Sequence, residues 1–118
     1  MALNIIGGTV SPSTPLTIDA KTSTTYTFAL TDANNELITA DNSSAQTYSI
    51  PTNASVAFPI GAQILFIQGG PGPILFAAGS GATIKAYNGY YRTAGTDIGA
   101  CAVKCAANTW RILGDLIA

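Results

Sequence analysis

Carboxylates are the first groups to consider for chemistry in this chain, because it contains no histidine. Glycoside hydrolysis, for example, needs two carboxylates that converge across a sugar. Nearly every acid here, however, stands in a sequence pattern typical of turns. We therefore expect turn or capping roles for the acids and no enzymatic activity. The acidic residues are Asp19, Asp32, Glu36, Asp41, Asp97 and Asp115.

Metal and phosphate sites also find little support. Residues 32–36, with the sequence Asp-Ala-Asn-Asn-Glu, partly resemble a calcium-binding loop. They lack the central glycine, the distal glutamate and the full set of alternating oxygen ligands of an EF-hand. The glycine-rich segments 69–72 and 79–81 lack the following helix and the lysine or third glycine of a phosphate-binding loop. We expect turns there, and no metal site or cofactor.

The two cysteines, Cys101 and Cys105, are four residues apart. On a strand, this spacing separates their Cα atoms by about 13 Å and directs both side chains to one face. A disulfide needs a Cα separation below about 7 Å, so an intrachain bond is excluded. We expect two buried thiols that act as small hydrophobes, with intersubunit pairing or a redox role as the alternatives. The absence of histidine excludes a Cys–His nucleophile and any zinc site that uses histidine.

Aromatic and basic side chains gather around the Asn-Gly pair at residues 88–89, which Tyr87 precedes. This pair predicts a two-residue hairpin loop. Tyr90, Tyr91 and Arg92 follow it, and tyrosine and arginine are favoured at interface hot spots. We name these three residues as interface candidates, with cross-strand packing inside the hairpin as the alternative.

Two further segments supply interface candidates. Phe58 and Ile60 lie on a predicted connection between strands, where an exposed Phe58 would indicate an interface and a buried one a core anchor. Near the N-terminus, Asn4, Ile5 and Ile6 could pair as a strand with a partner.

The segments that must position these residues have the pattern of short strands separated by turns. Residues 63–68 are apolar between two glutamines, which predicts a strand buried on both faces. In all, eight to ten strands spaced about 8 to 12 residues apart predict an all-β, single-domain antiparallel sandwich or barrel. The main predicted strands cover residues 24–30, 36–40, 47–50, 63–68, 74–78, 83–87, 100–106 and 109–113.

The N-terminal segment differs from the rest. We interpret residues 1–22 as an extended N-terminal arm and residues 23–118 as the β domain. Prolines at positions 12 and 15 disfavour a helix in the arm and keep it extended. A first edge strand with its loop, belonging to the same domain, is the alternative interpretation.

Charge is scarce throughout the chain. Charged residues make up 9% of it, against about 25% in typical domains, and residues 42–84 carry none. No basic stripe indicates nucleic acid, and no apolar run approaches the roughly 18 residues of a membrane span. No basic segment indicates a secretory signal. The uncharged strand surfaces favour a structural or assembly protein whose faces are covered by other protein chains.

Five segments, at residues 26–33, 50–61, 67–70, 76–84 and 108–116, follow one another in a distinctive order. In this order they resemble a small β domain of tailed-bacteriophage virion proteins. That domain occurs in head decoration (cement) proteins and in fibre or tail-tip modules. The resemblance covers about residues 24–116, and the chain departs from it at Cys101, Cys105 and residues 34–36.

The resemblance implies a structural role in the virion. The first expectation is a capsid decoration protein on the head surface. It would be a homotrimer at threefold positions that clamps the major capsid protein and stabilises the shell by mass action. The arm, about residues 2–16, would add β-pairing to the capsid or to a neighbouring subunit. The alternative is a receptor-binding fibre or tail-tip module that uses Tyr90, Tyr91 and Arg92 against a surface glycan or protein.

Overall fold

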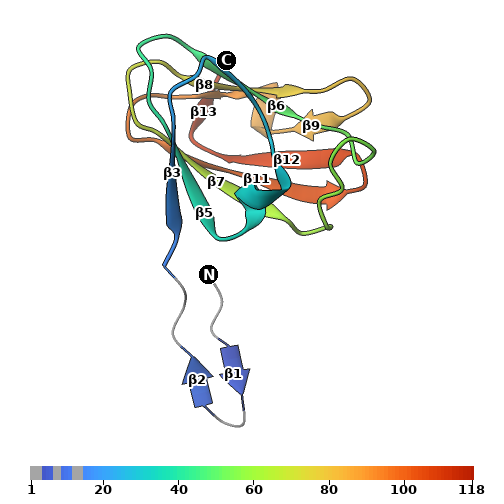
Figure 1. Cartoon of the computed structure of the whole chain (residues 1–118). Coiled ribbons are helices and arrows are strands. Elements are labelled where there is room, and N and C mark those ends of the chain that lie inside the picture. The colour runs from blue at the N-terminus through green and yellow to red at the C-terminus, as the bar shows by residue number, and fades with distance from the viewer. Residues whose placement is uncertain (1–3, 7–8, 12–14) are drawn as a thin grey trace.

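The computed structural model describes residues 4–6, 9–11 and 15–118, and it describes side chains from residue 15 onward. Two sheets stack face to face, which confirms the prediction of an all-β single-domain sandwich (Figure 1). In order, the five-stranded sheet consists of β13 (Leu116–Ile117), β10 (Arg92–Thr93), β8 (Ile74–Ala78), β6 (Gln46–Ile50) and β4 (Thr25–Thr27). The six-stranded sheet consists of β3 (Thr17–Lys21), β5 (Glu36–Ala40), β7 (Gln63–Gln68), β11 (Gly99–Ala106), β12 (Thr109–Gly114) and β9 (Thr83–Lys85).

From β3 to β8, the chain places successive strands in opposite sheets. β3, β5 and β7 are neighbours in one sheet, and β4, β6 and β8 are neighbours in the other. Each strand returns to its sheet in the same direction, so these neighbours pair in parallel. Antiparallel pairs occur elsewhere, as between β7, β11 and β12. The sandwich therefore contains both parallel and antiparallel pairs, and the prediction of an antiparallel sandwich is wrong. The sequence could not indicate the parallel pairs, because a short turn does not reveal which sheet the chain enters next.

The Asn88-Gly89 turn illustrates this ambiguity. Asn88 and Gly89 have φ angles of 55° and 68°, the positive values that the Asn-Gly sequence predicts. They end the short 3₁₀ helix η2 (Tyr87–Gly89). The flanking strands do not pair with each other, because β9 joins β12 in the six-stranded sheet while β10 joins β8 and β13 in the other. The turn connects the two layers, and the predicted hairpin is wrong.

The N-terminal segment forms two short strands before the sandwich begins. β1 (Asn4–Ile6) pairs antiparallel with β2 (Thr9–Ser11). Figure 1 shows this hairpin away from the sandwich, beyond the start of β3. β3 itself pairs in parallel with β5 from Thr17 to Lys21. Residues 17–21 of the predicted arm thus form an edge strand of the sandwich.

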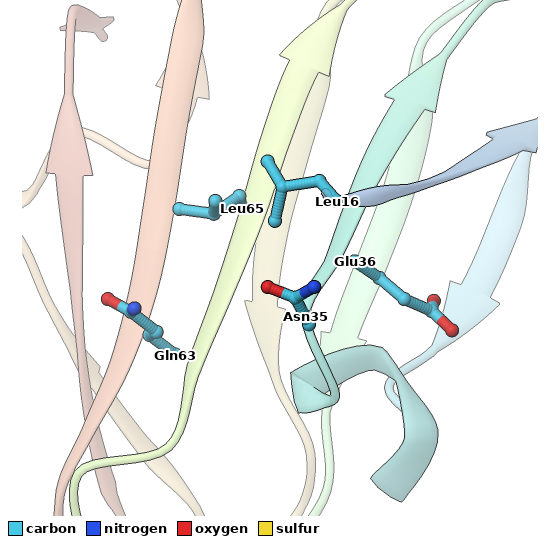
Figure 2. A pocket seen from close by; sticks show the side chains of 5 residues that line it. All are labelled: Leu16, Asn35, Glu36, Gln63 and Leu65. Carbon is cyan, nitrogen blue, oxygen red and sulfur yellow. The ribbon is translucent and has the colours of Figure 1, made fainter. Parts of the chain in front are cut away.

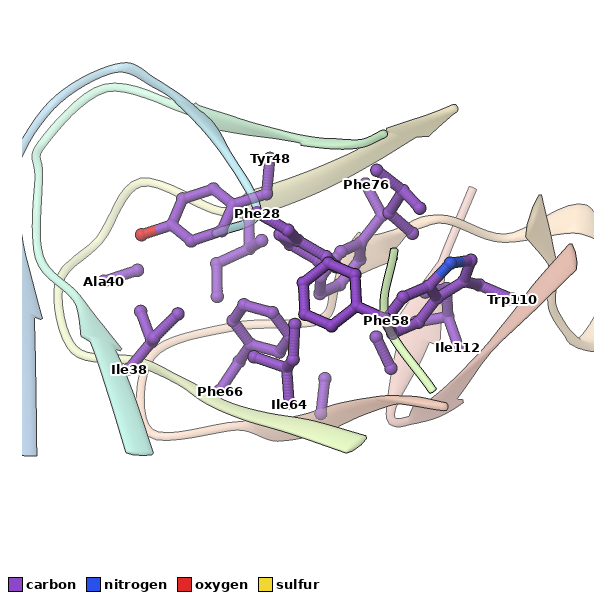
Figure 3. Packing of buried hydrophobic residues seen from close by; sticks show 14 residues of the cluster. Phe28, Ile38, Ala40, Tyr48, Phe58, Ile64, Phe66, Phe76, Trp110 and Ile112 are labelled. Carbon is purple, nitrogen blue, oxygen red and sulfur yellow. The ribbon is translucent and has the colours of Figure 1, made fainter. Parts of the chain in front are cut away.

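Aromatic side chains from both sheets fill the space between the layers (Figure 3). The ring of Phe66 stacks on Phe28 and meets Tyr48 edge-on, each at a centroid distance of 5.5 Å. Trp110 meets Phe28 and Phe58 edge-on at 5.7 and 5.1 Å. None of these rings is more than 3% exposed. Each such pair contributes about 0.5–1.5 kcal/mol beyond the burial of its area, so this cluster holds the two sheets together.

Alternation along each strand decides which residues enter the core. In β11, Ala100, Ala102 and Lys104 are buried, whereas Cys101 and Val103 face outward and are partly exposed. The two alanines leave room for the aromatic rings. The inward position of Lys104 is the exception to the apolar pattern.

Lys104 is 2% exposed and is held by hydrogen bonds. Its ammonium group donates to the backbone carbonyl of Phe58 at 2.6 Å and to Oδ1 of Asn53 at 2.7 Å. A buried ammonium is costly unless such partners replace its water. These bonds therefore fix the connection between β6 and β7 against β11.

Candidate interaction surface

Backbone pairing places five apolar side chains next to one another on the outer face of the six-stranded sheet. Ile18 of β3 pairs with Leu37 of β5, which pairs with Leu65 of β7. Leu65 also pairs with Cys101 of β11, and Cys101 pairs with Leu113 of β12. Along the strands these residues alternate with inward-facing positions, so they point away from the core. We call Ile18, Leu37, Leu65, Cys101 and Leu113 the apolar row.

The apolar row is open to solvent at both ends. Ile18 is 60% exposed and Leu113 is 55% exposed, while the three middle members are partly exposed. Leu16, 37% exposed, extends the row next to Leu65. Figure 2 shows the side chains of Leu16 and Leu65 close together, with the carboxylate of Glu36 directed away from them. A contiguous apolar strip of this kind on a sheet face is typical of a surface that another protein covers.

The shape of this surface also favours a protein partner. The hollow lined by Leu16, Asn35, Glu36, Gln63 and Leu65 has a volume of about 60 Å³. Pockets that enclose small ligands usually measure about 300–1,000 Å³. A flat strip with so shallow a hollow suits another sheet or loop better than a small molecule.

Charge on this face is confined to one margin. Val103 of β11 pairs with Arg111 of β12, which pairs with Lys85 of the edge strand β9. Side chains alternate between the two faces of each strand, and none of the outward-facing residues in these six described strands is acidic. A partner could therefore cover the apolar row without burying a carboxylate.

The outer face of the five-stranded sheet has a different character. Its first row runs from Thr25 through Thr47 and Leu75 to Arg92 and Ile117. The guanidinium of Arg92 donates to the carbonyl of Ala118 at 2.7 Å. A second row contributes further small residues. We call the hydroxyl-bearing part of these rows the hydroxyl face; it consists of Thr25, Thr27, Thr47 and Ser49.

The interface candidates predicted from the sequence lie elsewhere. Phe58 is 3% exposed and packs on Trp110, so it is a core anchor and the interface interpretation of Phe58 is wrong. Ile60, two residues later, is 62% exposed and keeps its candidate role. The backbone of Asn4, Ile5 and Ile6 forms β1, but their side chains lie outside the described residues.

The predicted aromatic tip is largely engaged inside the molecule. The hydroxyl of Tyr91 donates to the carbonyl of Ile84 at 3.0 Å, and Arg92 is held at the C-terminal strand as described above. Tyr90 is partly exposed and its ring meets that of Tyr87 edge-on at 6.4 Å. Tyr87, at 80% exposure, is the open aromatic side chain of this region; the sequence placed it in the aromatic cluster but not among the interface candidates.

The cysteines differ from the expectation of two buried thiols. Both are free; Cys101 is partly exposed within the apolar row and Cys105 is exposed. The pairing of β11 with β12 shifts between Lys104 and Ala106, so Cys105 occupies a β-bulge at the end of the strand. Burial raises the pKa of the Cys101 thiol. Cys101 is therefore a weak nucleophile that contributes apolar surface.

Three acids converge, which the turn patterns did not predict. Asp19 lies in β3 and Glu36 begins β5, the neighbouring strand, while Asp32 lies in the 3₁₀ helix η1 (Leu30–Ala33). One carboxylate oxygen from each lies within 4.8 Å of the other two. The predicted capping role fits Asp32, whose Oδ2 accepts hydrogen bonds from the backbone N–H of Ala29 and the hydroxyl of Tyr26. For Asp19, which lies in the paired strand β3, the turn prediction is wrong, whereas Glu36 begins a strand as the predicted range 36–40 has it.

Comparison with known proteins finds no matching family model, no similar curated protein and no similar solved structure. Among the residues described, no helix is long and apolar enough to cross a membrane.

Proposed function

We propose that this chain is a structural protein of a tailed-bacteriophage virion that decorates the capsid shell as a homotrimer. The observation that carries the proposal is the apolar row, which crosses five strands of a sheet face that has no acidic outward residue. The low content of charged residues also supports the proposal, because few charges oppose association. Burying an exposed Ile or Leu side chain contributes about 1.5–3 kcal/mol, so even the two open ends of the row would stabilise an interface.

The geometry of a trimer determines what the apolar row must contact. Around a threefold axis each subunit presents one surface to the next, so the row meets a different surface of its neighbour. Exposed apolar side chains outside the row are available for that contact. They include Leu30 at 50% exposure, Ile60 at 62% and Ile117 at 40%.

The hydroxyl face is the surface that we assign to the capsid shell. Its threonine and serine side chains are uncharged and can exchange hydrogen bonds with water or with a partner. Such a surface suits a contact that forms after both partners have folded, and these contacts are commonly more polar than permanent ones. A protein that binds the assembled lattice and not its separated subunits stabilises the lattice by mass action.

The direct experiment adds the purified protein to expanded phage heads that lack decoration. We expect saturable binding in multiples of three copies, together with increased resistance of the heads to heat and denaturant. Absence of binding, or binding without any gain in resistance, would exclude the decoration role.

Tyr87 favours a second candidate, a receptor-binding fibre or tail-tip module. Its ring is 80% exposed and lies against Tyr90, and exposed aromatic rings are suited to stack on sugars or to anchor in a protein pocket. Electron microscopy of the particle separates the two functions. Density over the head shell supports decoration, and density at the tail tip supports the receptor-binding module.

A further inference from the structure

The three converging acids lie at the edge of the sandwich where the N-terminal segment joins it. β3 and β5 pair in parallel with Thr17 opposite Glu36, so Asp19 follows two residues further along the same side of the sheet. Asp32 approaches from η1 and is 2% exposed, whereas Asp19 and Glu36 are partly buried. The carboxylate oxygens lie within 4.8 Å of one another, about twice the Ca–O distance of roughly 2.4 Å.

The negative charge of this cluster is only partly compensated by the described residues. Lys21 lies 3.2 Å from Asp19 Oδ2 and also 4.2 Å from the centre of the Tyr26 ring. Three carboxylates and one ammonium group leave a formal charge of −2 when all are ionised. A divalent cation carries the charge that would balance the cluster.

Two buried polar atoms at the cluster have no hydrogen-bond partner among the described residues. One is Oε1 of Glu36 and the other is the hydroxyl of Tyr48, a residue that is 0% exposed. The ring of Tyr48 lies 5.6 Å from that of Tyr26, whose hydroxyl donates to Asp32. Figure 3 shows the Tyr48 hydroxyl directed out of the aromatic cluster, past Ala40. Buried polar atoms without partners are rare, so both atoms indicate a missing partner on this side of the core.

The Tyr48 hydroxyl also lies within the electrostatic field of the acids. Burial raises the pKa of Tyr48 most, and the charges of Asp19 and Asp32 raise it further. The neutral phenol of Tyr48 can donate to a carboxylate or to a water molecule on a bound ion.

We propose that Asp19, Asp32 and Glu36 bind one divalent, oxygen-preferring cation, for which Ca²⁺ is the best match. Asp32 keeps Oδ2 on Tyr26 and Ala29, which fixes the orientation of its carboxylate and leaves the second oxygen for the ion. Ca²⁺ accepts irregular sets of six to eight oxygens at about 2.3–2.6 Å, so water molecules can complete its shell. Mg²⁺ demands a stricter and smaller octahedron.

The bound ion would join three separate elements. It would tie the edge strand β3 to β5 and to η1, at the place where the N-terminal segment enters the sandwich. Because a ligand that binds the folded state stabilises it by mass action, Ca²⁺ should raise the melting temperature of the protein. Cation binding at this site would not depend on any role in a capsid.

The test uses the full chain after removal of metal with a chelator. We expect Ca²⁺ to bind with one site per chain in calorimetry and to raise the melting temperature by several degrees. We expect Tb³⁺, which substitutes for Ca²⁺, to luminesce on tyrosine excitation because Tyr26 and Tyr48 lie beside the site. Absence of both calcium binding and Tb³⁺ luminescence from the folded protein overturns the proposal.

Matched variants separate binding from a purely structural role of the acids. Glu36→Gln keeps the shape of the side chain but removes one charge, so it should weaken Ca²⁺ binding at least tenfold. Without metal, the same variant should be as stable as the parent or more stable, because it relieves repulsion among the acids. Asp97→Asn, in an exposed turn with a φ of 66° that Asn also tolerates, should bind Ca²⁺ like the parent.

If Glu36→Gln does not fold, Asp19→Asn provides the same test at the neighbouring strand. Unchanged Ca²⁺ affinity in either folded variant contradicts the proposal. So does an equal loss of affinity in Asp97→Asn, which would indicate non-specific attraction to negative charge.

Discussion

The outer faces of the two sheets carry different side chains. The six-stranded sheet exposes the apolar row, whose ends, Ile18 and Leu113, are more than half exposed. The five-stranded sheet exposes threonine and serine hydroxyls along β4 and β6. Their inner faces, in contrast, contribute to one shared aromatic core. The need to form a core therefore explains the side chains of the inner faces. The difference in side chains between the outer faces must have another cause.

That difference suggests two kinds of partner. Permanent interfaces between subunits resemble a protein core and are rich in aliphatic side chains. Contacts between proteins that meet after folding are more polar and often contain water. We therefore assign the apolar row to contacts within the proposed trimer and the hydroxyl face to the proposed contact with the shell.

The strongest test of this comparison places charges on each face in turn. The double variant Ile18→Lys/Leu113→Lys should weaken self-association about a hundredfold or more, because each lysine removes roughly 1.5–3 kcal/mol of apolar burial and adds an unpaired charge. Both sites are largely exposed, so the melting temperature of the monomer should change little. Light scattering on a sizing column at several protein concentrations measures the effect.

The matched control is Thr25→Lys/Thr47→Lys on the hydroxyl face, which adds the same charge to the other sheet. It should remain a trimer. If the Ile18→Lys/Leu113→Lys variant remains a trimer while the control variant dissociates, our assignment of the two faces is reversed.

A second test compares the two sides of one strand. Ile64 of β7 is 0% exposed and Leu65, its neighbour, points outward within the apolar row. Ile64→Ala should lower the free energy of unfolding by about 2–5 kcal/mol. Leu65→Ala should lower the free energy of unfolding of the monomer much less, and it should weaken self-association instead. Urea unfolding at low protein concentration gives the first quantity, and sedimentation at higher concentration gives the second; equal unfolding costs would contradict the assignment.

A smaller effect is expected from a single charge on the hydroxyl face. Thr47→Lys should lower the affinity for undecorated heads about tenfold, or roughly 1.4 kcal/mol, because the lysine would be desolvated in the contact. The trimer itself should not change. Co-sedimentation with heads measures the affinity, with Ser55→Lys on an exposed connection as the control. Equal losses in both variants would show that added charge, and not the hydroxyl face, determines binding.

The smallest effect concerns the two thiols. Cys105 is exposed and should react quickly with a maleimide, whereas Cys101 is partly buried and its raised pKa reduces its thiolate. Cys101 should react several-fold faster in Ile18→Lys/Leu113→Lys than in the parent, because dissociation uncovers the row. Mass spectrometry of the labelled peptides measures both rates. The same Cys101 rate in both proteins would indicate that no subunit covers it.

Local sequence patterns predicted much of this fold. The strands Glu36–Ala40, Gln63–Gln68 and Ile74–Ala78 have the predicted bounds, because their alternation or apolar content is strong and turn residues flank them. Parallel pairing was missed, since it depends on which sheet each short turn leads into. Asn88-Gly89 has the predicted backbone conformation but connects two layers.

The candidate surface was harder to predict, because it arises from register between distant strands. Cys101 and Leu113 lie on consecutive strands, but Leu65 becomes a neighbour of Cys101 through the pairing of β7 with β11, which has no local signal. Alternation showed that Cys101 and Cys105 would share a face, but not that this face is the outer one. Lys104, between the two cysteines, is buried, although a lysine on a strand usually faces outward.

The molar mass in solution tests the central claim most directly. The chain has a mass of 12.0 kDa, so light scattering at micromolar concentration should give three times this value for the parent protein. The variant Ile18→Lys/Leu113→Lys should give 12.0 kDa under the same conditions. A parent protein that stays at 12.0 kDa across the micromolar range would contradict the claim that sister chains cover the apolar row.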